Sequence, residues 1–170
     1  MTINIYRKYL EIKSLKDLNE VTKPSENFLL ELIDPHDFQL NKFFYKQIGN
    51  KHRWIDRLEW TDQNWISYIS NKSLLTFVLK DNSEPAGYFE LIIHEAKNES
   101  EVAYFGILEE YFGKKLGGFL LSEAIKKSFE LGLKRVWLHT SSLDHKNALK
   151  NYLSRGMTIF KSETLKQHSH

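Results

Sequence analysis

The segment 111–118, YFGKKLGG, constrains the fold more than any other part of this chain. It holds three glycines and two lysines between a strand-like run, EVAYFGIL, and a helix-like run that begins near Leu116. A strand that passes through a glycine-rich turn into a helix directs unpaired amides and the positive end of the helix dipole at one point. Such a turn suits an anion such as phosphate, and an ordinary strand-to-helix turn with two solvated lysines is the alternative.

Two common phosphate-binding motifs do not fit this segment. Gly113 and Gly118 have the glycine spacing of a P-loop, but Phe119 and Leu120 stand where that motif has Lys and then Ser or Thr. The dinucleotide fingerprint needs three glycines at a different spacing after the opening strand of a parallel sheet, whereas the preceding strands here read as a meander. The segment is therefore neither a P-loop nor a dinucleotide-binding turn.

Composition excludes several classes of protein. The 170 residues, 41% of them hydrophobic, suit one domain over 1–170 with a substantial core. The 24 basic residues nearly balance the 22 acidic ones, so nothing favours a nucleic-acid partner. The absence of cysteine excludes disulfides, thiolate metal sites and a cysteine nucleophile. No apolar run has the length of a signal peptide core or a membrane span, so we expect a cytoplasmic protein with no membrane partner.

The spacing of apolar residues predicts an α/β (α+β) fold in which antiparallel strands come first and strand-helix-strand units follow. Runs rich in branched and aromatic residues predict the strands, and apolar stripes at helical spacing predict the helices. The predicted strands lie at 27–33, 74–80, 86–95, 101–108, 134–140 and 157–163, and the predicted helices at 38–48, 55–70, 116–131 and 147–155.

The stretch from Glu101 to Met157 resembles the acyl-CoA-binding core of the GNAT N-acetyltransferase family. Its ending, ALKNYLSRGM, is similar to the family's Ala-x-x-x-Tyr-x-x-x-Gly-Phe, with Met157 in place of the Phe. The segments HRWIDRLEW and HTSSLDH resemble a bacterial subgroup of unsettled substrate. The resemblance implies a single domain with a mixed sheet of about six to seven strands and about four helices. It also implies an acyl-CoA-binding core over 101–163.

In the family, the loop Gln/Arg-x-x-Gly-x-Gly/Ala binds the pyrophosphate of coenzyme A through its amides. Here this loop falls on 112–117, where Gly117 matches while Phe112 and Lys115 depart from the pattern. Asn147 is a further candidate contact, whose alternative role is a hydrogen bond at the start of the next helix. The family's usual Asn nearby is replaced by His145. The resemblance implies coenzyme contacts at Phe105, Gly106, Ile107, Phe112, Gly113, Lys114, Lys115, Leu116, Gly117, Gly118 and Asn147.

Acetyl transfer requires a neutral amine and a proton for the departing thiolate. Tyr152 stands at the position that resembles the family's general acid, and packing at the domain edge is its alternative role. A phenol of reference pKa about 10 keeps its proton at neutral pH and can give it to a thiolate. The family often uses a strand glutamate as base, which makes Glu101 and Glu90 the candidates. Each would otherwise be a solvated residue on the outer face of a strand.

The segment around HRWIDRLEW corresponds to one wall of the family's acceptor pocket. Trp54, Arg57 and Trp60 are the candidate contacts there, and core packing is the alternative for each of them. The cluster in HTSSLDH invites comparison with a hydrolase triad or a metal site, but neighbours in sequence rarely point at one another. We expect no metal.

The resemblance therefore implies an acetyl-CoA-dependent N-acetyltransferase that acts on a primary amine of a small molecule or peptide. The amine would attack directly in a ternary complex, and the protein would be a monomer or homodimer. A non-catalytic acyl-CoA-binding or regulatory module on the same fold is the first alternative. A module that binds nucleic acid or protein is the second.

Overall fold

The computed structural model describes residues 2–52 and 54–168, which form a seven-stranded mixed sheet with four α-helices. The strands lie in the order β2-β3-β4-β5-β6-β1-β7, and every neighbouring pair is antiparallel except β5 and β6. The strands are β1 Thr2–Ile12, β2 Phe28–Leu32, β3 Leu74–Asp81, β4 Glu84–His94, β5 Glu99–Ile107, β6 Arg135–Ser141 and β7 Thr158–His168; the helices are α1 Phe38–Gly49, α2 Asp62–Ile69, α3 Leu116–Glu130 and α4 Ala148–Ser154.

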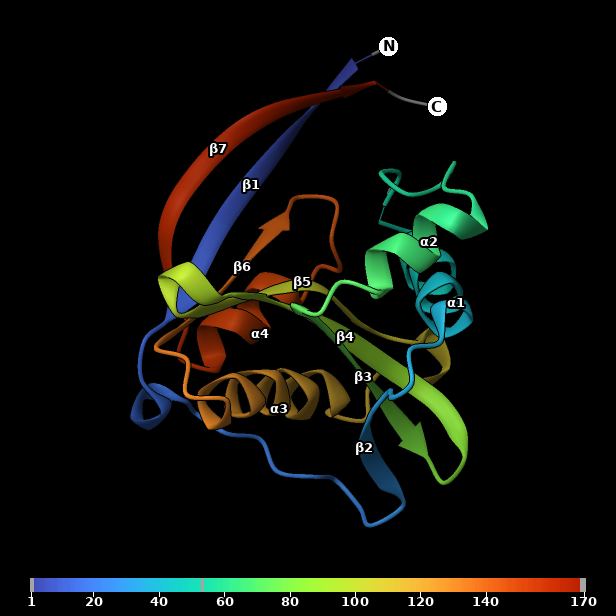
Figure 1. Cartoon of the computed structure of the whole chain (residues 1–170). Helices are drawn as coiled ribbons and strands as arrows, with labels where there is room; N and C mark the ends of the chain where they lie inside the picture. The colour runs from blue at the N-terminus through green and yellow to red at the C-terminus, as the bar shows by residue number, and fades with distance from the viewer. Residues whose placement is uncertain (1, 53, 169–170) are drawn as a thin grey trace.

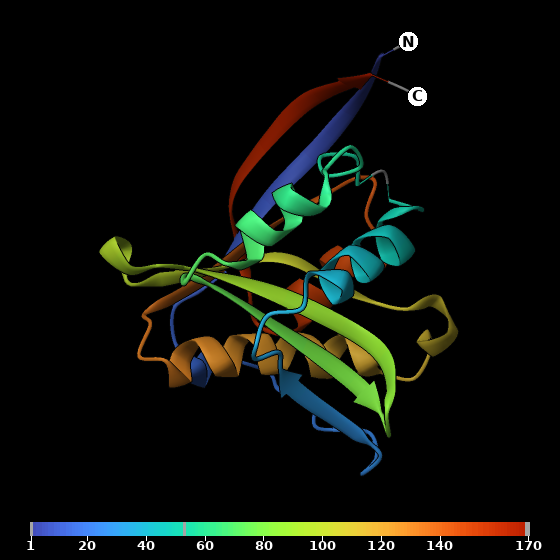
Figure 2. The ribbon, with the colours of Figure 1, turned by 45° about the vertical axis from the view of Figure 1, so that its right-hand side comes forward.

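The helices cover opposite faces of the sheet (Figures 1 and 2). On one face, α3 buries Leu120, Leu121, Ala124 and Ile125 against the strands, and α4 adds Tyr152 to the same core. On the other face, α1 buries Phe44, whose ring stacks on Tyr88 of β4 at 4.7 Å between ring centroids. The predicted fold class is confirmed, because the sheet is mixed and strand-helix-strand units follow a meander.

Strands β5 and β6 pair over only three residues and then separate. Glu99, Ser100 and Glu101 lie opposite Arg135, Val136 and Trp137 in a parallel arrangement. Beyond this point β5 stays paired with β4, while β6 stays paired with β1. A register shift between β4 and β5, where Glu90 faces Tyr104 and Leu91 faces Val102, inserts one extra residue into β5. Such a bulge bends a strand, which accounts for the opening between β5 and β6.

Glycines allow the turns just before and just after α3. Gly113 has φ of 80° and Gly132, just past the end of α3, has φ of 84°. Both angles lie in the left-handed region, which glycine adopts without steric cost. The helix predicted over 116–131 is confirmed, since α3 extends from Leu116 to Glu130.

Two predicted boundaries were wrong. The helix predicted over 55–70 begins only at Asp62, because Thr61 caps it in a reciprocal pair of hydrogen bonds with Asn64. The last strand extends from Thr158 to His168, because β1 pairs with it along its length and the two form a ribbon that projects from the sheet (Figure 1). Within residues 2–52 and 54–168, no helix has the length and hydropathy needed to cross a lipid bilayer.

Candidate functional site

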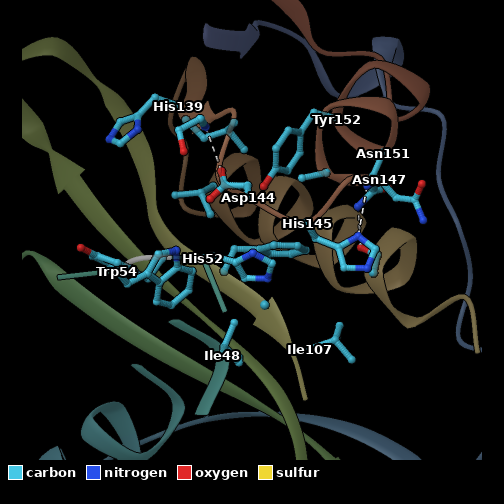
Figure 3. A pocket seen from close by; sticks show the side chains of 18 of the residues that line it. Ile48, His52, Trp54, Ile107, His139, Asp144, His145, Asn147, Asn151 and Tyr152 are labelled. Atoms are coloured by element: carbon cyan, nitrogen blue, oxygen red, sulfur yellow. Dashed lines mark hydrogen bonds between the residues drawn. The ribbon is translucent and has the colours of Figure 1, made fainter. Parts of the chain in front are cut away.

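Residues of β5 and β6 line a cavity of about 970 Å³ at the place where these two strands separate. Figure 3 shows part of its lining. On the α3 and α4 side of the sheet it is lined by Leu116, Gly117 and Tyr152. On the α1 and α2 side it is lined by Trp54 and Arg57. Since the two pairs of helices cover opposite faces, one cavity connects both faces of the sheet.

The glycine-rich turn forms one end of this cavity. Lys115, Leu116 and Gly117 line it together with Gly113 and Gly118. Lys115, which precedes the first turn of α3, makes no side-chain hydrogen bond to that turn. The first amides of a helix have no partner within the helix, so those of α3 keep their capacity to bind an anion.

The two glycines of the first helical turn have different neighbours. A Cβ atom on Gly117 would meet only Asn151, whose Nδ2 would lie 3.6 Å away. Asn151 Nδ2 also donates a hydrogen bond to the Gly117 carbonyl oxygen (3.1 Å). A Cβ atom on Gly118 would collide with Arg155 and would lie 2.9 Å from Val21 Cγ2. The absence of a side chain at Gly117 leaves space in the cavity. The absence of a side chain at Gly118 allows Val21, in the segment before β2, to approach α3.

The other predicted coenzyme contacts are mostly brought to the same cavity. Phe105, Gly106 and Ile107 line it from the edge of β5 that has no partner strand, and Phe112 lines it from the loop. Lys114 is not part of the lining, and its Nζ lies over the Tyr111 ring at 5.4 Å from the centroid.

Asn147 also lines the cavity, and its side chain makes no capping hydrogen bond to α4. The alternative role at the helix start was therefore wrong. The backbone N–H of Asn147 donates instead to Nδ1 of His145 (3.1 Å), whose ring meets Phe112 edge-on at 5.0 Å between centroids.

Tyr152 enters the cavity from α4 (Figure 3). Its side chain is 7% exposed, and its ring contacts Phe105 at 6.3 Å between centroids in an edge-on arrangement. Burial, and to a smaller extent the charge of Asp144, raise the pKa of Tyr152 well above its ordinary value. The hydroxyl therefore holds its proton at neutral pH and is available as a proton donor.

The two predicted carboxylates lie in different surroundings. Glu90 is completely buried and does not line the cavity. It accepts hydrogen bonds from Tyr68 Oη (2.6 Å) and Asn41 Nδ2 (2.8 Å), and it pairs with Arg57 at 3.3 Å. Glu101 lines the cavity, and its Oε1 lies 3.1 Å from Nε2 of His94. Only Glu101 is placed where a bound molecule could reach it.

Of the three residues predicted to form the acceptor wall, two line the cavity and the third does not. Trp54 lines the cavity and meets Tyr104 edge-on at 4.9 Å between centroids. Arg57 also lines it, although the residue is only 6% exposed, and its guanidinium lies 4.0 Å from the Tyr68 ring centroid and 4.1 Å from that of Tyr104. Trp60 does not line the cavity, since it packs on Trp65 in the adjoining aromatic cluster.

Removing one partner of the buried pair of Arg57 and Glu90 should strongly destabilise the protein. We expect Arg57→Met to lower the free energy of unfolding by about 3–5 kcal/mol, because it leaves a buried carboxylate without its counter-charge. Lys42→Met is the matched control, because Lys42 pairs with Asp62 at 3.1 Å on the surface. This substitution should lower the free energy of unfolding by less than about 1 kcal/mol. Urea unfolding would measure both, and equal losses for the two variants would contradict this account.

Several lining residues were missed by the sequence analysis. Asn151, next to Tyr152, could have been found from its place in the tyrosine motif. Tyr104 and Asp56, joined by a hydrogen bond from the tyrosine hydroxyl (3.3 Å), gave no signal because they lie 48 residues apart. His52, whose Nδ1–H donates to the Leu143 carbonyl oxygen (2.9 Å), likewise joins distant segments. Among the described residues, no group of three or more His, Asp or Glu is arranged to hold a metal ion.

Comparisons with known proteins agree with this architecture. Residues 37–157 match the model of the acetyltransferase (GNAT) family. A GCN5-related N-acetyltransferase from Sphaerobacter thermophilus is 14% identical, with 96% of this chain and 51% of that chain covered and a TM-score of 0.70. This chain thus spans about half the length of that protein. No curated protein sequence matches significantly.

Two further solved structures share the fold. An aminoglycoside acetyltransferase from an uncultured soil metagenomic sample, in complex with trehalose, is 11% identical, with 78% of this chain and 90% of that chain covered and a TM-score of 0.65. The PaiA N-acetyltransferase from Thermoplasma acidophilum, in complex with coenzyme A, is 21% identical, with 62% of this chain and 74% of that chain covered and a TM-score of 0.50. At these identities the likeness concerns the fold alone.

Proposed function

Because this chain belongs to the acetyltransferase (GNAT) family, we propose that it transfers an acetyl group from acetyl-CoA to a primary amine of a small molecule or peptide. The observation that carries this proposal is one continuous cavity, which joins the glycine-rich turn at the start of α3 to Tyr152 and continues to the opposite face of the sheet. Two substrates that enter from opposite faces would meet in the opening between β5 and β6. The proposal therefore includes direct attack in a ternary complex, carried out by one domain over 1–170 with its acyl-CoA-binding core at 101–163.

The residues around the cavity suit the two chemically distinct parts of coenzyme A. The uncapped amides of α3, with Lys115 at their edge, would bind the pyrophosphate. The free edge of β5 from Phe105 to Ile107 would hydrogen-bond to the amide-containing pantetheine arm, as one strand binds another. Asn147, whose side chain makes no capping bond, would contact the same arm. Lys114 lies outside the lining and would contribute only charge.

Tyr152 would act as the general acid. Its hydroxyl is protonated at neutral pH and lies at the cavity, so it can give a proton to the thiolate that departs from the thioester. Of the two carboxylates predicted as bases, we propose that Glu101 meets the ammonium group of the acceptor, because it lines the cavity on the face that carries Trp54. Glu90 would act indirectly, by holding Arg57 in the wall.

Acetyl-CoA should raise the thermal midpoint of unfolding. A ligand held at 100 times its dissociation constant stabilises the folded state by about 2.7 kcal/mol, which corresponds to roughly 5–11 °C for a domain of this size. Differential scanning fluorimetry with acetyl-CoA would measure the shift. Pantetheine, which lacks the pyrophosphate, is the control and should shift the midpoint much less. An unchanged midpoint at millimolar acetyl-CoA would refute the proposed coenzyme site.

A further inference from the structure

His139 in β6 lies on the acceptor side of the sheet. In β6 the residues 137, 139 and 141 share one face, because side chains alternate along a strand. Trp137 lies opposite Glu101 of β5, and Glu101 lies opposite Ile92 of β4. Ile92 shares its face with Glu90, which holds Arg57 on the α1 and α2 side. His139 and Glu101 therefore face the same half of the cavity, and both line it.

The imidazole of His139 belongs to an exposed side chain that lines the cavity. Its side chain is exposed, and neither ring nitrogen has a hydrogen-bond partner among the residues that the structure describes. Its nearest aromatic neighbour is Tyr9 of β1, at 5.4 Å between ring centroids. In Figure 3 the His139 side chain lies on the far side of Asp144 from Tyr152. A histidine in this situation is free to exchange a proton with a bound molecule.

Charged groups of β1 and β7 lie around Tyr9, whose ring contacts this imidazole. Tyr9 donates a hydrogen bond to Glu163 of β7 (2.7 Å), and the same carboxylate pairs with Arg7 of β1 at 3.6 Å. Lys161 of β7 lies over the Tyr9 ring, 4.9 Å from its centroid. Arg7 itself lines the cavity. Of these groups, Arg7 acts on the charge of His139, whereas Lys161 and Glu163 contact Tyr9.

These surroundings keep His139 neutral. The residues around His139 shield its ring partly from water, which lowers the pKa of His139, and the positive charge of Arg7 lowers this pKa further. The carboxylates of Glu101, Asp144 and Asp56 act in the opposite direction but do not reverse the shift in pKa. A pKa below the ordinary value of about 6.5 means that the imidazole carries an unprotonated nitrogen at neutral pH.

We propose that His139 accepts the proton which the acceptor ammonium must lose before it can attack, while Glu101 holds that ammonium in place. This inference rests on the proposed acetyl transfer. A reference imidazole, of pKa about 6.5, is a stronger base than a reference carboxylate, of pKa about 4.3, by roughly two units. An alkylammonium has a pKa of about 10.4, and the neutral amine is at most about a hundredfold easier to form with this imidazole than with a reference carboxylate, because the lowered pKa of His139 makes it a weaker base than the reference imidazole.

The proton balance closes over one turnover. His139 takes one proton from the ammonium, and the nitrogen lone pair then forms the C–N bond as the C–S bond breaks. Tyr152 gives its proton to the thiolate. The second proton that the nitrogen loses as the amide forms restores the Tyr152 hydroxyl through solvent. The imidazolium of His139 then releases its proton to solvent, so each turnover produces one free proton.

The test compares His139→Gln with the wild-type protein on two amines that differ in basicity. Ethylamine is protonated at neutral pH, whereas its fluorinated analogue trifluoroethylamine is already neutral and needs no base. With ethylamine we expect kcat/KM to fall by about a hundredfold or more in the variant, the usual contribution of general base catalysis. With trifluoroethylamine the loss should be no more than a few-fold. The wild-type pH profile for ethylamine should fall on the acidic side as His139 becomes protonated, and the variant should lack this limb.

Other results would show whether the role of His139 or the proposed acetyl transfer itself is wrong. Equal losses on both amines would assign His139 a structural role and overturn the inference, as would an unchanged rate with ethylamine. If the wild-type protein transfers acetyl to no amine, the proposed function fails and this role fails with it. Should the variant not fold, an NMR titration of the wild-type ring decides instead, and a His139 that stays protonated at neutral pH would overturn the inference.

Discussion

Replacing Tyr152 by Phe should lower the turnover number by about a hundred- to ten-thousand-fold, the usual contribution of a general acid. The substitution removes one hydroxyl and little volume, so the edge-on contact with Phe105 should persist. Because the hydroxyl would act on the departing thiolate, the dissociation constant for acetyl-CoA should stay within a few-fold of the wild-type value, as expected for an interaction made in the transition state. Steady-state kinetics and calorimetric titration would measure the two quantities separately.

The matched control for this substitution is Tyr88→Phe. Tyr88 is also buried, but it lies outside the cavity lining, and its hydroxyl has no hydrogen-bond partner among the described residues. Its removal should leave turnover unchanged. Wild-type turnover in Tyr152→Phe would return Tyr152 to a packing role. Coenzyme affinity that falls in proportion to turnover would make Tyr152 a binding residue.

Gly117→Glu should abolish the stabilisation by acetyl-CoA while α3 stays formed. The new carboxylate would project from the first turn of the helix into the space where the pyrophosphate is proposed to bind. Repulsion between the carboxylate and the phosphates, together with loss of the open approach to the amides, should remove binding. The thermal shift with acetyl-CoA should then disappear, and the circular dichroism of the folded variant should resemble that of the wild type.

Gly117→Ala is the control that separates charge and bulk from the loss of glycine itself. A Cβ atom at this position has only Asn151 within 4 Å, so alanine should be accepted without strain. The alanine variant should keep most of its coenzyme affinity. Wild-type affinity in a folded Gly117→Glu variant would place the phosphate site elsewhere.

The elements that position the cavity could be predicted because their signals are local. The glycine-rich turn, the apolar stripe of α3 and the glycine after its end all lie within about one helix length of sequence. Tyr152 could be placed in a helix for the same reason. These local signals predicted the residues at the end of the cavity where we propose that coenzyme A binds. They did not predict the opening between β5 and β6, which depends on a bulge in β5 where it pairs with β4.

The surroundings of the other end of the cavity, where we propose that the acceptor binds, could not be predicted because they depend on contacts between residues that are distant in the sequence. Strand alternation correctly puts Glu90 on a sheet face, but only the folded chain brings Arg57 across to it from 33 residues away. The same applies to Trp60, an aromatic residue in a promising segment that packs beside the cavity and does not line it. The start of α2 was also missed, because Thr61 and Asn64 cap the helix after an irregular segment whose apolar residues mimic helical spacing.

The central claim is that this chain moves an acetyl group to an amine, and the most direct test follows the group itself. The full chain would be incubated with acetyl-CoA that carries an isotopic label in the acetyl group and with a library of primary amines, and mass spectrometry would identify labelled products. We predict labelled amide together with an equal amount of free coenzyme A, both formed much more slowly by Tyr152→Phe. Binding of acetyl-CoA with no labelled amide from any amine would contradict the claim and favour a non-catalytic acyl-CoA-binding module.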